Sequence, residues 1–171
     1  PGGHPRWSSK SGRSVTLVWE DVAETSAAQV VWSSLPDWFD AGRRMETRID
    51  GLLAGKDGRG RALAGDASSL TVAEAARRVF EAVSVPPGQP GRWEDAGAAV
   101  DVLRAGTGTG ADRAVVLLSL LRVAGYDARP AQFRPVGARG AFPVTVPAPA
   151  IVPLPAIVVY RKDKEPLWID P

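Results

Sequence analysis

Residues Arg104–Arg122 read RAGTGTGADRAVVLLSLLR, in which glycines at alternate positions precede a long apolar run. From Ala111 to Ala124 the apolar residues leave almost no polar face, which predicts a helix that is buried on most sides. Gly125 follows this run and predicts its C-terminal stop. We therefore expect the rest of the fold to pack around one central helix, and the glycines to lie at its N-terminus.

The glycine-rich segment resembles a phosphate-binding loop only superficially. A dinucleotide fingerprint needs G-x-G-x-x-G between a strand and a helix, whereas the spacing here is G-x-G-x-G and the preceding AVDVLRA is predicted to be helical. A P-loop carries Lys and Ser/Thr after its last glycine, but Gly110 is followed by Ala111 and Asp112. Asp112 would place negative charge where a helix N-terminus would hold a phosphate. The sequence therefore argues against nucleotide binding.

Helices are predicted on the N-terminal side of this stretch. An amphipathic helix is capped by Ser34 and ends at Gly55. Thr71–Val83 begins with a capping box and continues with one apolar face. Val85–Gly91 is rich in proline and breaks the chain, and Trp93–Leu103 is short, rich in alanine and predicted to be helical.

Strands are predicted on the C-terminal side. Ala128–Val136 reads as a strand whose prolines favour the edge of a sheet. Gly137–Pro155 is rich in proline and predicts a long surface loop. Ala156–Arg161 is a strand, Lys162–Glu165 the turn and Pro166–Asp170 the returning strand. Helices followed by antiparallel strands predict an α+β fold.

The N-terminal third differs in character. Residues 1–13 are rich in Gly, Ser and Pro and predict a flexible segment, and Ser14–Val22 and Ala27–Ser34 predict strands. We expect three parts: residues 1–34, a flexible segment and strands that end a preceding β domain; residues 35–70, a linking helix and a Gly-rich loop; and residues 71–171, the main domain.

Composition excludes several classes of chemistry. The 171 residues include no cysteine and one histidine, His4, so neither a thiolate nucleophile nor a metal site built from several His or Cys ligands is expected. The net charge of +2 does not indicate nucleic-acid binding. No apolar run is long enough to span a membrane. We expect no cofactor and no metal, and a chain that is a segment of a longer protein.

The order of motifs around the central helix resembles the transglutaminase-like superfamily, which has a papain-like fold related to the cysteine proteases. Bacterial members show G-x-C-x-D-x-A, then LLR-x-x-G-x-x-A-R, then H-x-x-V, and finally W-x-D-P. Gly108–Ala114, Leu120–Arg129 and Trp168–Pro171 match these motifs apart from the Cys. The strands that precede Pro36 resemble, more weakly, the end of a bacterial β-rich domain of unknown function that often precedes such modules.

The resemblance implies a cysteine nucleophile at the N-terminus of the helix, a histidine base on a strand and an aspartate on the next strand. The matching positions are Gly110, Ala156 and Asp170, so only the aspartate is kept. Removal of a nucleophile or base from such a unit costs many orders of magnitude in rate. We therefore expect a pseudoenzyme rather than a thiol enzyme.

Four residues are expected to line the vestigial cleft: Thr109, Asp112, Trp93 and Trp168. Each has a structural alternative, namely packing for the tryptophans and helix capping for Asp112. Asp170 is expected to cap a turn or to pair with an arginine, and Arg122 and Arg129 are candidate partners for it or for Asp112.

The resemblance thus predicts a non-catalytic structural or ligand-binding module of a larger bacterial protein, located at the cell envelope. Its partners would be a peptide, glycan or protein in the vestigial cleft, and neighbouring domains of the parent chain. Two alternatives remain open. One is a hydrolase or acyltransferase with relocated chemistry, using Asp112 and Asp170 as acid and base. The other is an interaction module in which the Pro-rich segment Val144–Pro155 adopts polyproline II and binds a partner. If this segment instead packs over the vacant cleft, it would act as a plug.

Overall fold

A computed structural model describes residues 6–11, 14–18, 37–53, 65, 69–133 and 154–171. The chain divides into two compact units, Pro1–Trp32 and Ser33–Pro171. The predicted strand at 27–34, most of the Gly-rich loop after Gly55, and residues 137–153 of the predicted surface loop lie outside the described residues.

The first unit contains a two-stranded antiparallel ribbon. β1 (Arg6–Ser11) pairs with β2 (Ser14–Val18), with a register shift between Trp7 and Ser9. Residues 6–11 are therefore a strand, and the prediction of a flexible segment was wrong for them. β1 is polar and has no clear alternation of apolar and polar residues, so its only signal is the pairing with β2, which periodicity does not detect.

The second unit begins with α1 (Trp38–Asp50). Its cap is Asp37, whose carboxylate accepts a hydrogen bond of 2.7 Å from the amide of Asp40, so the prediction of Ser34 as the cap was wrong. The helix ends at Asp50, where the amide of Gly51 closes the last turn, which is earlier than the predicted end at Gly55. The apolar stripe continued past the helix end because the turn that follows is also packed against the core.

α3 (Val72–Ala82) begins as predicted, because the Thr71 hydroxyl accepts a hydrogen bond from the Glu74 amide. The helix predicted from 93 to 103 is in fact two elements, the 3-10 turn η2 (Trp93–Asp95) and α4 (Ala99–Ala105). Between them the Gly97 amide donates a hydrogen bond to Asp112. This tertiary contact holds the chain extended where local propensity favours a helix.

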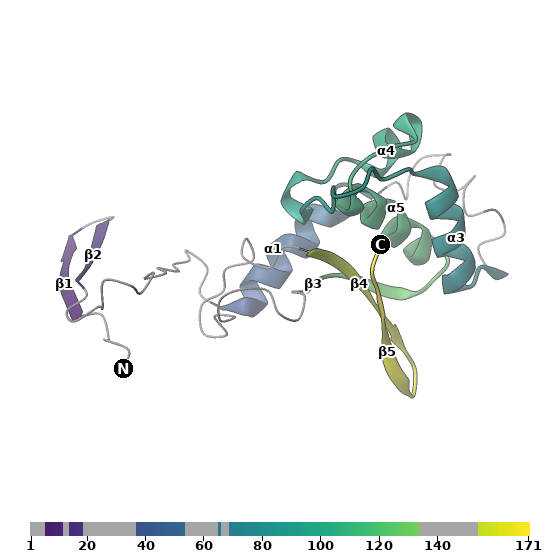
Figure 1. Cartoon of the computed structure of the whole chain (residues 1–171). Coiled ribbons are helices and arrows are strands. Elements are labelled where there is room, and N and C mark those ends of the chain that lie inside the picture. Colours follow the sequence, from purple (N-terminus) through teal and green to yellow (C-terminus); the bar gives the residue numbers. More distant parts are fainter. Residues whose placement is uncertain (1–5, 12–13, 19–36, 54–64, 66–68, 134–153) are drawn as a thin grey trace. The chain divides into compact units, whose positions relative to one another are not determined.

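α5 (Gly110–Val123) is the centre of the unit, and ten of its 14 residues are buried. It contacts α3, α4, β3 and β4, which lie around it in Figure 1. The prediction of a buried central helix is confirmed. The turn after the helix uses Gly125, whose φ of +85° is unfavourable for residues with a side chain.

β3 (Asp127–Phe133), β4 (Leu154–Arg161) and β5 (Lys164–Ile169) form an antiparallel sheet in the order β3-β4-β5. β3 is an edge strand, as its proline, Pro130, predicted. The last two residues of the predicted surface loop, Leu154 and Pro155, belong to β4. The described part of the second unit is thus an α+β structure.

The two faces of this sheet have different surroundings. Ala128, Ile157 and Val159 belong to the core that includes α5. Because side chains alternate along a strand, the residues between them point to the other, outer face. On that face Val158 lies opposite Trp168, whose side chain is exposed.

Candidate functional site

The N-terminus of α5 is the site that the sequence singles out, and a reciprocal capping box forms it. The Thr109 hydroxyl oxygen accepts a hydrogen bond of 3.2 Å from the Asp112 amide. Asp112 Oδ2 accepts hydrogen bonds from the Thr109 amide, at 2.7 Å, and from the Thr109 hydroxyl, at 2.9 Å. Asp112 Oδ1 accepts a further bond of 2.7 Å from the Gly97 amide. Both side chains therefore hold the local backbone, and neither carries a free group that points to a substrate.

The first amides of α5 are covered by the proline-rich segment that precedes η2. The Gly110 amide donates to the Gln89 carbonyl at 2.9 Å, and the Ala111 amide donates to the Pro90 carbonyl at 2.8 Å. The first amides of a helix have no partner within the helix and are the groups that would hold an anion. Here the protein's own backbone occupies two of them.

Close packing explains two of the three alternating glycines, Gly108 and Gly110, whereas Gly106 ends α4 with a φ of +68°. A Cβ atom at Gly110 would lie 2.7 Å from the Pro90 carbonyl oxygen, which is backbone and is held by the Ala111 amide. A Cβ atom at Gly108 would lie 2.8 Å from the Cβ of Asp112. The glycines thus allow the chain to fold tightly against the start of α5, and Gly110 has no room for a cysteine side chain without movement of Pro90.

Trp93 is a core residue rather than the wall of a cleft. Its side chain is 1% exposed and belongs to the core that surrounds α5. Its indole Nε1 donates a hydrogen bond of 2.6 Å to the carbonyl of Ala131 in β3. Of the two interpretations of Trp93 in the sequence, core packing is therefore the one that the structure supports. Trp168 is 62% exposed on the outer face of the sheet.

The other two positions singled out by the resemblance lie in β4 (Ala156) and directly after β5 (Asp170). Ala156 pairs with Ala131, and extension of the β4–β5 register by one residue places Asp170 beside Ala156. Ala156 is buried but is not part of the core around α5, which takes its neighbours Ile157 and Val159. By strand alternation, a side chain at 156 points away from the face that packs on α5.

Asp112 and Asp170, the candidate acid–base pair, have different surroundings. The carboxylate of Asp112 accepts the hydrogen bonds of the cap, and Asp170 is exposed after the end of β5. Arg122 and Arg129, their candidate arginine partners, form ion pairs with other carboxylates.

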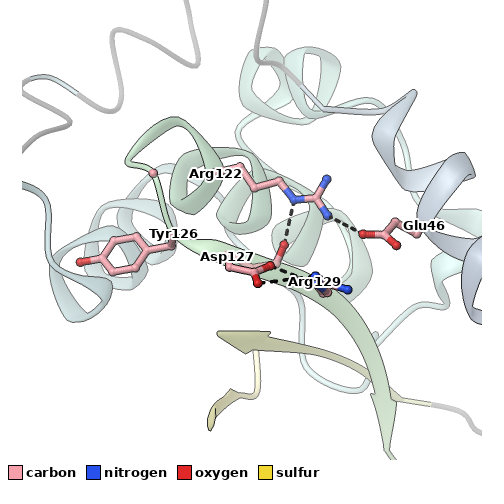
Figure 2. A pocket seen from close by; sticks show the side chains of 7 residues that line it. Glu46, Arg122, Tyr126, Asp127 and Arg129 are labelled. Carbon is pink, nitrogen blue, oxygen red and sulfur yellow. Dashed lines mark hydrogen bonds and ion pairs between the residues drawn. The ribbon is translucent and has the colours of Figure 1, made fainter. Parts of the chain in front are cut away.

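An open hollow of about 640 Å³ lies where α1, the end of α5 and the start of β3 meet. Figure 2 shows the Arg122 side chain directed toward Glu46 and toward the start of β3. Arg122 pairs with Asp50 and, at 3.4 Å, with Glu46, and its Nε donates to the Ala128 carbonyl at 2.8 Å. Arg122 therefore joins one helix to another and to the sheet.

Arg129 lies on the same hollow and is paired with Asp127 at 3.0 Å. The hydrogen bond that Arg129 donates to Asp127 raises the pKa of its guanidinium. Its charged group also lies over the ring of Tyr160, 5.4 Å from the centroid. Each arginine of the hollow is already paired with carboxylates of the protein. We therefore interpret the hollow as a structural junction rather than a binding site. Sequence reasoning missed it because Glu46 and Arg122 are 76 residues apart, and no local pattern links them.

Within the described residues, no group of three or more His, Cys, Asp or Glu side chains is placed to hold a metal ion. The described helices include none that is long and apolar enough to cross a membrane. In comparisons with protein-family models, with curated proteins and with solved structures, nothing matches this chain.

Proposed function

We propose that this chain is a non-catalytic transglutaminase-like domain that serves as a structural or ligand-binding module of a larger bacterial protein, at the cell envelope. The observation that carries the proposal is the start of α5. Where the family places its nucleophile, this chain has Gly110, whose amide is bonded to the Gln89 carbonyl and whose Cβ direction is filled by Pro90.

The missing base supports the same proposal. The second unit contains no histidine in its sequence, and position 156 is a buried alanine. A hydroxyl such as that of Thr109 needs a neighbouring base to become a nucleophile. The only carboxylate bonded to it, Asp112, is held by three hydrogen bonds as part of the helix cap.

The test is a sensitive assay of the unmodified protein for ammonia release from glutamine peptides and for transfer of the acyl group to an amine. We expect no rate above the uncatalysed reaction, because a triad that lacks its nucleophile and base loses orders of magnitude in rate. Asp170→Asn is assayed beside the unmodified protein, with Asp163→Asn as the matched control in the exposed hairpin turn. Turnover by the unmodified protein that Asp170→Asn abolishes and Asp163→Asn leaves intact would overturn the proposal.

A further inference from the structure

α1 carries three acidic residues and three arginines. Two of the acidic residues, Glu46 and Asp50, pair with Arg122 at the junction shown in Figure 2. Its three arginines, Arg43, Arg44 and Arg48, line a different hollow of about 450 Å³ together with Asp40 and Thr47. We call these three residues the arginine face.

The arginine face has more positive charge than its neighbours neutralise. Asp40 is its only carboxylate partner in the described part of the chain, at 2.8 Å from both Arg43 and Arg44. Arg44 Nε lies 2.8 Å from Asp40 Oδ2, and Arg43 pairs with the other carboxylate oxygen. Arg48 donates to the backbone carbonyl of Glu94 instead of a carboxylate. The hydrogen bond from Arg43 lowers the pKa of Asp40 below its usual range, as expected in a positive environment.

The spacing of the arginines suits an extended chain. Arg44 and Arg48 are one helical turn apart, which is about 6 Å along the axis. In an extended peptide, side chains on the same side are two residues apart, or roughly 6.6 Å. Carboxylates at alternate positions of such a peptide would meet successive arginines, and guanidinium groups bind carboxylates in pairs of hydrogen bonds. Phe39, which is 80% exposed, lies one turn before Arg43 and offers an apolar contact.

We propose that the arginine face binds an extended acidic peptide segment of a partner protein, with carboxylates at alternate positions. A membrane surface fits less well, because the apolar stripe of α1 that would enter the lipid, including Met45 and Ile49, is packed in the core. Duplex nucleic acid also fits less well, because three arginines within two turns contact few phosphates. This binding does not depend on the transglutaminase-like assignment, so its failure would leave that assignment unaffected.

The test measures binding of a fluorescently labelled hexaglutamate peptide to the full chain by anisotropy at low salt. We expect saturable binding that Arg48→Ala weakens several-fold and that Arg43→Ala with Arg48→Ala weakens at least about ten-fold, since each substitution removes one charged partner of the peptide. Arg48→Ala leaves both ion pairs of Asp40 in place. Arg104→Ala is the matched control, because Arg104 is also an exposed helical arginine with one carboxylate partner.

The expected pattern is loss of binding with the face variants and less than about two-fold change with Arg104→Ala. Urea unfolding of each variant shows that the loss is not a loss of folding. The proposal is overturned by the absence of saturable binding, by equal weakening in Arg104→Ala, or by tighter binding of a 25-base-pair DNA duplex or of vesicles that contain phosphatidylserine.

Discussion

Replacement of Gly110 by alanine is expected to lower the free energy of unfolding by about 1–3 kcal/mol, the usual cost of an extra methyl group in a filled space. The new Cβ atom would lie 2.7 Å from the Pro90 carbonyl oxygen. That oxygen cannot move aside freely, because it accepts the hydrogen bond from the Ala111 amide. The loss would be measured by urea unfolding of the two proteins.

Gly42→Ala is the matched control for this substitution. Gly42 also lies within a helix, but a Cβ atom there would meet nothing within 4 Å. Alanine is favoured over glycine in helices, so this variant is expected to be more stable by roughly 0.4–1 kcal/mol. The two substitutions therefore have opposite predicted signs. A Gly110→Ala protein that is as stable as the unmodified one would show that Pro90 does not close the start of α5.

Replacement of Trp93 by alanine is expected to cost about 3–5 kcal/mol, the range for loss of a buried large aromatic residue. The side chain is 1% exposed and lies among the core residues that surround α5. Its removal also leaves the Ala131 carbonyl without the indole donor. Thermal and urea unfolding would both report the change.

Trp168→Ala is the control, because Trp168 is 62% exposed and a surface substitution changes stability by no more than about 0.5 kcal/mol. Trp93→Phe keeps most of the ring and loses only the hydrogen bond, so it is expected to lie between the two. Equal losses in the free energy of unfolding for Trp93→Ala and Trp168→Ala would mean that Trp93 is a surface residue. That result would favour its alternative interpretation as the wall of a cleft.

The run Leu120–Arg129, on which the proposed family resemblance rests, has a packing role in this structure. In this run, Arg122 donates a hydrogen bond to the Ala128 carbonyl, and Gly125 makes the turn after α5. Ala128 lies in β3 with its side chain buried in the core. Arg129 lies on Tyr160 of the neighbouring strand. These residues fix how the end of α5 joins β3. The motif is thus compatible with a scaffold kept without its chemistry.

Local signals in the sequence were sufficient for the central elements. The apolar run after Gly110 predicted α5, and the Thr71 capping box predicted the start of α3, because both depend on residues within one or two turns. Pro130 likewise predicted that β3 lies at the edge of the sheet, because a proline has no amide to donate to a neighbouring strand.

Features fixed by distant contacts were not predictable. The break between η2 and α4 depends on a hydrogen bond from Gly97 to Asp112, 15 residues away. The burial of Trp93 depends on a strand 38 residues later. The same holds for the candidate site. The sequence identified Gly110 as the decisive position, but the carbonyls that bind the first amides of α5 belong to Gln89 and Pro90. The pattern of that proline-rich segment predicted only a break in the chain.

Amide hydrogen exchange at Gly110 and Ala111, measured by NMR on the unmodified protein, tests most directly whether the start of α5 is closed. Amides in the first turn of a helix lack intrahelical partners and normally exchange rapidly. If the Gln89 and Pro90 carbonyls hold them, both amides will be protected by several orders of magnitude, with rates near those of the interior amides of α5. Exchange of these two amides at rates close to those of an unfolded chain, beside a protected α5 interior, would contradict the account.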